Sequence, residues 1–299
     1  MTANDGSRSL VVQQDGKLLA WLLEELRPMS RTSVKQLLAQ GCISVNDEPT
    51  TQFDHPLKPN DRVLITREGK GPTTRKPEGL PIVYKDDALI VIDKPEGLLS
   101  VATEIERRDT AFALLNAELT AKQEGRPFVV HRLDRDTSGL ILFARDVEVR
   151  DRLQANWEGV TKTYLAVAEG TPNPPEGMVR NYLTEGRDLR VRASEVQREG
   201  SKHAVTRYKV LETRGPYSLL EVVLKTGRKH QIRVHLAGLG CPVIGDEGYG
   251  AKTNPVRRLG LHAWKLEFDH PVTGQRLELE SPLPKNLKRV VSSTEVGQE

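Results

Sequence analysis

The sequence predicts an α+β protein in which a small αβ module precedes a larger domain built on a largely antiparallel mixed sheet. Beyond residue 80, strand-like runs outnumber helix-like stretches and do not alternate regularly with them, a pattern typical of antiparallel sheets. A segment rich in Gly, Pro, Thr and basic residues, 67–80, has the composition of a linker. We therefore expect a flexible start at 1–16, domains at 17–66 and 81–290, and a flexible tail at 291–299.

The first module is expected to hold two helices followed by short strands. Leucines at helical spacing between residues 19 and 26 predict the first helix, which Pro28 ends. Ser30 is suited to cap a second helix, and Gly41 is suited to close it. Short apolar runs then predict strands at 43–45 and 62–65.

In the larger domain, apolar or alternating runs predict most of the strands, and three longer stretches read as helices. The expected strands are Leu89–Ile92, Phe128–Val130, Leu140–Ala144, Tyr164–Ala168, Ala204–Leu211, Leu219–Lys225 and Leu261–Phe268. The expected helices are Thr110–Gln123, Val147–Glu158 and Gln231–Leu239.

Composition narrows the functional class. The chain has 299 residues, 28% of them charged, a net charge of +3 and a pI of about 8.8, which suits a globular protein and is compatible with RNA. No apolar run approaches the roughly 20 residues needed to cross a bilayer, and no secretion signal is evident, so we expect no membrane partner and a cytoplasmic location. The two cysteines, Cys42 and Cys241, lack metal-ligand spacing, and no metal is expected.

The segment from Val130 to Leu140 carries the densest polar chemistry, because a loop containing Asp134 and Asp136 lies between two apolar strands. Rigid scaffolds often place catalytic groups on such loops. The alternative is a charged connecting turn in which Arg132 and Arg135 neutralise the two carboxylates.

A second segment, Leu224 to Leu236, joins a strand to an expected helix through a loop that carries Arg228 and Lys229. Cations at the start of a helix oppose its dipole unless an anion is present, and RNA phosphate or a carboxylate could supply that anion. A solvated surface loop is the alternative.

These segments resemble the RluA/RluD-type family of RNA pseudouridine synthases. The matching stretches occur in the family's order over residues 80 to 285: Asp87–Gly97, His131–Asp134 with Thr137–Gly139, Lys162–Tyr164, Thr226–Arg228 with His230–His235, Gly245–Asp246 with Tyr249–Gly250, and Leu261–Ala263 with His270–Pro271. Two positions depart from the family's usual residues: Asp93 stands where Asn is usual, and Lys229 where Thr is usual.

The resemblance implies roles for individual residues. Asp134 corresponds to the essential aspartate, Tyr164 to the aromatic residue that stacks on the target base, and Arg233 to the arginine that pairs with the aspartate. Arg132 corresponds to the arginine that enters the RNA stack in place of the extruded uridine. Leu261 corresponds to an apolar residue under the base.

Residues 17–66 resemble an S4-type RNA-binding domain, in which Arg31 and Lys35, one helical turn apart, would contact phosphate together with Arg228 and Lys229 of the larger domain. The resemblance implies a cofactor-free isomerase that acts on RNA. We expect a monomer whose substrate is large-subunit (23S) ribosomal RNA, with transfer RNA as the alternative.

The reaction suits these residue types. Uracil leaves C1′, turns and reattaches through C5, which needs an ionised carboxylate but no redox partner or group donor. A nearby Arg favours the ionised form of a carboxylate. The sequence leaves open whether Asp134 attacks C1′, attacks C6 or removes a ribose proton. It also leaves two other functions to be excluded: a non-catalytic RNA-binding protein of the same fold, and a Mg²⁺ nuclease using Asp134 and Asp136.

Overall fold

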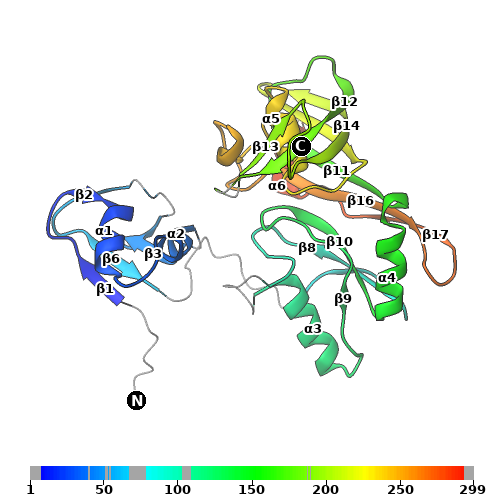
Figure 1. Cartoon of the computed structure of the whole chain (residues 1–299), viewed down its shortest axis with the longest axis horizontal. Coiled ribbons are helices and arrows are strands. Elements are labelled where there is room, and N and C mark those ends of the chain that lie inside the picture. The colour runs from blue at the N-terminus through cyan, green and yellow to red at the C-terminus, as the bar shows by residue number, and fades with distance from the viewer. Residues whose placement is uncertain are drawn as a thin grey trace, which may run out of the picture. The chain divides into compact units, whose positions relative to one another are not determined.

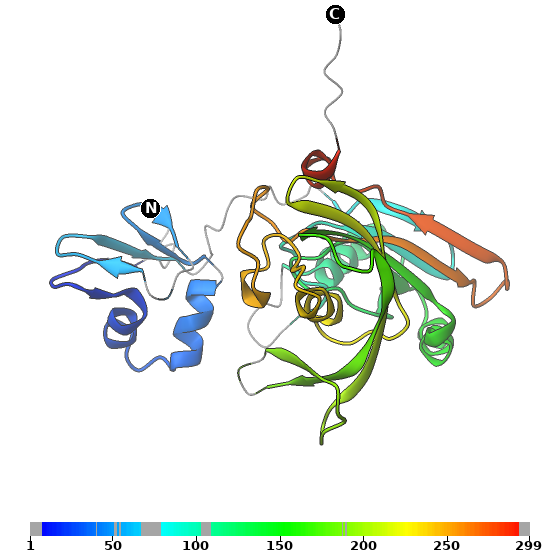
Figure 2. The same cartoon turned by 90° about the horizontal axis from the view of Figure 1, so that it is seen from above.

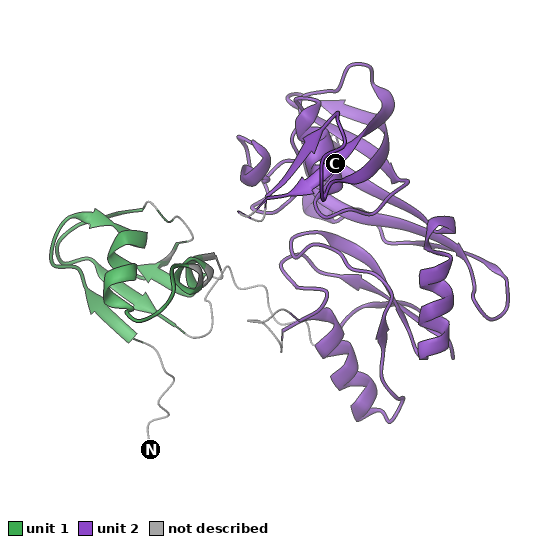
Figure 3. Cartoon of the chain, in the orientation of Figure 1, with its two compact units in different colours: residues 1–77 green, residues 78–299 purple. Residues whose placement is uncertain are grey.

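The chain forms two compact units, Met1–Pro77 and Glu78–Glu299 (Figure 3). The computed structural model describes residues 8–39, 41–50, 53, 55–66, 79–102, 109–186, 188 and 190–292. Residues 67–78 of the expected linker and 293–299 of the expected tail lie outside the described residues. The two units are treated separately below.

In the first unit, helices α1 (Leu18–Glu25) and α2 (Arg31–Ala39) enclose one core with a four-stranded sheet. The Ser30 hydroxyl accepts a hydrogen bond from the Ser33 amide at 3.1 Å, which caps α2 at its start. The sheet order is β1 (Arg8–Val11), β6 (Arg62–Ile65), β3 (Ile43–Val45), β4 (Glu48–Pro49), and β2 (Gly16–Lys17) pairs separately with β5 (Pro56–Leu57).

Part of the segment 1–16, which was expected to be flexible, forms a strand that belongs to the sheet of the first unit. Strand β1 pairs antiparallel with β6, and Leu10 stands opposite Val63. Val12, just beyond β1, is buried in the core of this unit. Pairing gives the backbone groups along that edge of β6 their hydrogen-bond partners, and burial of Val12 removes apolar surface from water. The folded unit therefore includes the strand Arg8–Val11, which lies within the segment expected to be flexible.

The second unit is built on an 11-stranded sheet that curls along its length (Figures 1 and 2). Among the described strands, every pairing in it is antiparallel except that of β10 with β16, which confirms the predicted α+β class with a largely antiparallel mixed sheet. The main order is β13 (Val191–Ser194), β12 (Glu176–Glu185), β14 (Lys202–Arg214), β15 (Tyr217–Leu224), β11 (Thr161–Glu169), β16 (Leu261–Asp269), β10 (Ser138–Ala144), β8 (Leu89–Lys94), β7 (Ile82–Lys85), with β17 (Arg276–Glu280) on β16 and β9 (Phe128–Val129) on β10.

Both faces of β8 and β10 are covered by helices. Ile92 and Ile141 are register partners in the core beneath α3 (Ala111–Ala121), whereas Leu89 and Leu142 lie in the core beneath α4 (Val147–Ala155). Successive residues of a strand point to opposite faces, so a strand covered on both sides reads as a continuous apolar run. This explains why these strands were readily predicted.

The other end of the sheet also has a helix on each face. Ala166 of β11 shares a core with Leu236 of α5 (Gln231–Gly238), and the next residue, Val167, shares a core with Leu287 of α6 (Lys285–Val291). Alternation along β11 therefore places α5 and α6 on opposite faces. In the described part of the chain, no helix is long and apolar enough to cross a lipid bilayer.

Candidate active site

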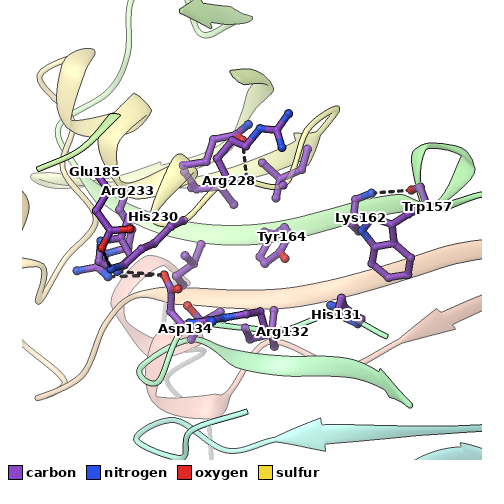
Figure 4. A pocket seen from close by; sticks show the side chains of 18 residues that line it. His131, Arg132, Asp134, Trp157, Lys162, Tyr164, Glu185, Arg228, His230 and Arg233 are labelled. Atoms are coloured by element: carbon purple, nitrogen blue, oxygen red, sulfur yellow. Dashed lines mark hydrogen bonds and ion pairs between the residues drawn. The ribbon is translucent and has the colours of Figure 1, made fainter. Parts of the chain in front are cut away.

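A pocket of about 540 Å³ opens in the second unit on the face that bears α5 (Figure 4). Its walls come from the loop before β10, from β11 and β16, and from the start of α5. A volume of this size suits a small-molecule or nucleoside ligand. All seven site residues predicted in the larger domain line it: Arg132, Asp134, Tyr164, Arg228, Lys229, Arg233 and Leu261.

The loop that carries Asp134 is fixed through its backbone on both sides of the aspartate. The Ser100 hydroxyl accepts from the Leu133 amide at 2.9 Å and donates to the Leu133 carbonyl at 2.8 Å. The Lys94 ammonium, fully buried, donates to the carbonyl of Arg135 at 3.0 Å and to those of Pro95 and Leu98. Burial lowers the pKa of Lys94 to about 7, and Asp136 opposes that shift. Asp134 thus sits between two anchored peptide groups.

Gly139, which ends the polar motif of this loop, allows β10 to lie beside β16. Its φ is +110°, and an added Cβ would lie 2.2 Å from the Ala263 carbonyl oxygen. No other residue type could hold the parallel register of Gly139 with Ala263 without a shift of backbone. This short parallel contact brings the Asp134 loop next to the strand that supplies Leu261.

Helix α5 is bound to the sheet by buried polar side chains, which explains the alternation in the segment His230–His235. Gln231 donates to the Val205 carbonyl at 3.0 Å and to the Thr206 hydroxyl at 2.9 Å. His235, one turn later, bonds to the Thr206 hydroxyl and the Asn181 side chain. With Gln231 and His235 facing the sheet, Arg233 between them points to the pocket.

Arg233 is held by a residue to which sequence reasoning assigned no role. Its Nε and Nη2 donate to the two carboxylate oxygens of Asp246 at 2.6 and 2.8 Å, while its Nη1 lies 3.7 Å from Asp134 Oδ2. Burial acts against the charge of Arg233, but Asp246, helped by Asp134 and Tyr249, offsets it, and the pKa of Arg233 lies above its ordinary value. The expected pairing with Asp134 is thus a looser contact, and the bidentate partner is Asp246.

His230 begins α5 with a left-handed backbone, φ +53°, which is costly for a residue with a side chain. Its Nδ1 lies 2.8 Å from the Tyr249 hydroxyl, which itself accepts from the Val191 amide at 3.1 Å. The hydroxyl can therefore donate to Nδ1, a direction that would place the proton of a neutral ring on Nε2. Nε2 lies 3.8 Å from Asp134 Oδ2. Burial lowers the pKa of His230 despite Asp134.

Asp134 itself remains open to a ligand. Its side chain is 24% exposed, and His230 Nε2 and Arg233 Nη1, at 3.8 and 3.7 Å from its Oδ2, lie beyond hydrogen-bond distance. Among the described residues that line the pocket, the other carboxylate is Glu185, which is paired with Lys229. Asp134 therefore has two basic neighbours, Arg233, which was expected from sequence, and His230, which was not.

Tyr164 forms the wall of the pocket beyond Asp134. It is 9% exposed, and burial raises its pKa well above the ordinary value, so the hydroxyl is neutral. The pairing of β11 with β16 shifts register between Thr163 and Tyr164, leaving Trp264 as an extra residue on β16. Such bulges re-aim side chains next to active sites. Leu261, buried opposite Ala166, adds apolar wall.

The cations predicted to contact RNA lie in different places. Arg132 and Arg228 are exposed at the pocket, and the Arg228 side chain also donates to the His203 carbonyl at 3.1 Å. Lys229 is paired with Glu185, so it is less available than expected. Arg31 and Lys35 are exposed on α2 in the other unit, four residues apart.

Three further residues belong to the pocket or its support: Asp246, Tyr249 and His230. The sequence did single out these three positions, because they fall within the stretches that resemble the family: Gly245–Asp246, Tyr249–Gly250 and His230–His235. Spacing alone did not indicate which of them would touch Arg233. Within the described ranges, no group of three His, Cys, Asp or Glu could hold a metal ion.

A pocket of nucleoside size with an available carboxylate, an aromatic wall and a cationic rim is what an RNA-modifying enzyme requires. Comparison with known proteins defines the class further. The family model for RNA pseudouridylate synthase matches residues 88–238, a range that includes Asp134, Tyr164 and Arg233. The chain belongs to the RNA pseudouridylate synthase family and is an enzyme whose substrate is RNA.

Relatives resemble the chain over nearly its whole length. The RNA pseudouridine synthase YlyB of Bacillus subtilis is 33% identical over 94% of this chain and 95% of the relative. The ribosomal large subunit pseudouridine synthase D of Nitrosomonas europaea is 34% identical over 97% of this chain and 88% of the relative. The structure of human RNA pseudouridylate synthase domain containing 1 is 27% identical, with a TM-score of 0.60 over 74% of this chain and 91% of that one.

Proposed function

We propose that this enzyme converts uridine to pseudouridine at a defined position of large-subunit ribosomal RNA, with Asp134 as the catalytic carboxylate. The observation that carries the proposal is the carboxylate of Asp134, which lines the pocket and is approached by Arg233 at 3.7 Å without being closed off by a hydrogen bond. A carboxylate locked in a bidentate pair would have to break that pair before it could react. Asp246 takes that pair instead.

The target uridine must leave the RNA stack to reach Asp134. Extruding a base costs a few kcal/mol, which contacts in the pocket must offset. Tyr164 offers a stacking face, and Leu261 adds apolar contact on the same wall. Arg132, exposed at the mouth, fills the gap left in the RNA and contacts phosphate.

The bond changes balance without any co-reactant. The N1–C1′ bond breaks, the free base turns within the pocket, and a C5–C1′ bond forms. The proton on C5 is then lost, while N1 gains one. We assign the removal of the C5 proton to the oxygen of the neutral Tyr164 hydroxyl, which passes its own proton to water as it takes the proton from C5, while N1 takes a proton from water. Asp134 acts on the ribose or the base before the turn.

The choice of large-subunit ribosomal RNA rests on two relatives of this chain, one from Nitrosomonas europaea and one from Neisseria meningitidis. Each is named ribosomal large subunit pseudouridine synthase D. We assign residues 17–66 to an S4-like RNA-binding domain that extends the contact with structured RNA. Arg31 and Lys35 would each neutralise a phosphate there, and each such contact steepens the salt dependence of binding. The enzyme acts as a monomer in this proposal, in the compartment where ribosomal RNA matures.

The test uses RNA transcribed with uridine tritiated at C5. Incubating the protein with a large-subunit ribosomal RNA transcript should release tritium to water, because C5 loses its hydrogen, and the release should persist in a chelator. A transfer RNA pool labelled in the same way serves as the comparison. No release from either RNA would mean a non-catalytic binder. Cleavage of the RNA without tritium release, stopped by the chelator, would instead indicate the Mg²⁺ nuclease, and tritium release from transfer RNA alone would correct the substrate.

A further inference from the structure

A lysine lies inside the pocket without a carboxylate partner. Lys162 is 8% exposed and lines the cavity. Its ammonium donates to the Trp157 carbonyl at 3.3 Å, and in the part of the chain that the structure describes it forms no ion pair. Burying a charge without a counterion is costly. The position therefore favours an anion that arrives with the ligand.

The neighbours of Lys162 hold it but do not neutralise it. The ammonium lies 5.0 Å from the centroid of the Trp157 ring, which in turn stacks on His131 with centroids 4.8 Å apart. His131 Nε2 accepts a hydrogen bond from the Leu142 amide, and burial, together with Lys162, lowers the pKa of His131 to about 3. His131 is therefore neutral. Neither Trp157 nor neutral His131 carries a negative charge, so the charge of the Lys162 ammonium is left for a ligand to neutralise.

Lys162 lies close enough to the expected position of the base to contact a phosphate of the same nucleotide. It is two residues before Tyr164 on β11, on the same face, and this spacing places the two residues about 6.6 Å apart. In Figure 4, Tyr164 lies between Asp134 and the pair formed by Lys162 and Trp157. A uridine stacked on Tyr164 with its ribose toward Asp134 would bring a backbone phosphate within reach of this end of the pocket.

We propose that Lys162 binds a phosphate of the RNA backbone beside the extruded uridine, and that the Trp157 ring and carbonyl hold the ammonium in place for it. This inference rests on the proposed function for the identity of the ligand. A compact ammonium with unused N–H groups is suited to a phosphate oxygen, and the partly desolvated site strengthens the contact. Burial, and next Lys225, lower the pKa of Lys162 to about 8 against the opposing charge of Glu158, which forms no ion pair with it, and a bound phosphate would raise the pKa again.

Three full-length variants test the subsite on the tritiated large-subunit transcript. Lys162→Met removes the charge at similar volume, Lys162→Arg keeps a cation, and Lys288→Met removes an exposed cation of α6, on the opposite face of the sheet from the pocket. Lys162→Met should lose about tenfold or more in kcat/KM, mostly through KM. The slope of log affinity against log salt should become shallower by about 0.7 to 1. The arginine variant should recover much of both losses.

The control separates a local phosphate contact from general charge. Lys288→Met should keep the wild-type KM and salt slope, and an equal loss in that variant would overturn the subsite. A loss of activity in Lys162→Met with an unchanged salt slope would mean that the lysine only supports the fold.

A small-ligand titration followed by NMR keeps the subsite testable even if the wild-type enzyme turns over neither RNA. Uridine 3′,5′-bisphosphate should bind the wild type more tightly than uridine does, and Lys162→Met should remove the difference. Equal binding of the bisphosphate by both proteins would contradict the subsite, whatever the RNA assays give. Inorganic phosphate that binds as tightly as the bisphosphate would indicate a free-phosphate site instead of an RNA contact.

Discussion

Arg233 gives two of its guanidinium nitrogens to Asp246 and turns only the third toward Asp134, at 3.7 Å. The buried Asp246 carboxylate thus fixes the direction of Arg233 without drawing it onto Asp134. Bidentate arginine–carboxylate pairs fix geometry as well as charge. The arrangement keeps a cation near Asp134 while leaving that carboxylate open to substrate.

Replacing Asp246 with Asn should therefore lower the catalytic rate. Asn cannot match the charge of Arg233, so the guanidinium would turn to Asp134 and occupy the oxygens that the substrate needs. We expect a loss of roughly 10- to 100-fold in the single-turnover rate on labelled RNA with little change in RNA affinity. Glu247→Gln, which alters the exposed neighbouring carboxylate, is the matched control. An undiminished rate in Asp246→Asn would show that Arg233 does not depend on this pair.

Gly139→Ala should unfold the catalytic unit at lower denaturant than the wild type. The new Cβ would meet the Ala263 carbonyl oxygen at 2.2 Å, in a backbone conformation that already disfavours a side chain. The expected loss in free energy of unfolding is roughly 3 kcal/mol or more. Gly215→Ala, at φ +55° with nothing near its Cβ, should lose about 1 kcal/mol. Urea unfolding measures both, and equal losses would refute the steric argument.

Lys162→Met should make the protein more stable at neutral pH. The pKa of Lys162 is about 8 in the fold and near 10.5 when unfolded, so burial of its charge opposes folding fully below pH 8. That penalty fades as pH rises from 8 to 10.5. The variant should gain about 1 to 3 kcal/mol at pH 7 and lose this advantage near pH 10.5. A variant that unfolds more easily than the wild type at pH 7 would indicate that the ammonium stabilises the fold.

Tyr164→Phe separates the two roles proposed for this residue. The ring that stacks on the base remains, but the hydroxyl proposed for C5 deprotonation is lost. RNA binding should stay within about twofold, while tritium release should fall by about 10²-fold, the scale of general acid–base catalysis. The measurement is tritium release compared with RNA affinity. Full tritium release by the Phe variant would remove the hydroxyl from the mechanism.

The sequence predicted the strands that are buried on both faces, and it also found β14, which has one exposed face, but it missed β12 and β1. β8 and β10 read as unbroken apolar runs because α3 and α4 cover them. β12, in contrast, alternates exposed and buried residues and includes Glu176 and Arg180, so its composition resembles a loop. β1 was missed for a similar reason, since its four residues are largely exposed and its partner β6 lies over fifty residues away.

The candidate site shows a comparable division. Asp134 and Arg233 were expected to be neighbours, and their closest side-chain atoms lie 3.7 Å apart. The roles of Asp246 and Tyr249 depend on a turn at Gly245, whose φ is +74° and whose missing Cβ would lie 2.3 Å from the Arg258 carbonyl oxygen. That turn brings Asp246 back to α5, and no periodicity in the sequence encodes such a return.

The most direct test of the account is the activity of Asp134→Asn on the tritiated large-subunit ribosomal RNA transcript. Asn is nearly the same shape but cannot be ionised, so the variant should fold and bind RNA like the wild type. We expect tritium release at background level, even with enzyme in excess over RNA. Release at the wild-type rate from the Asn variant would contradict the assignment of Asp134 as the catalytic carboxylate.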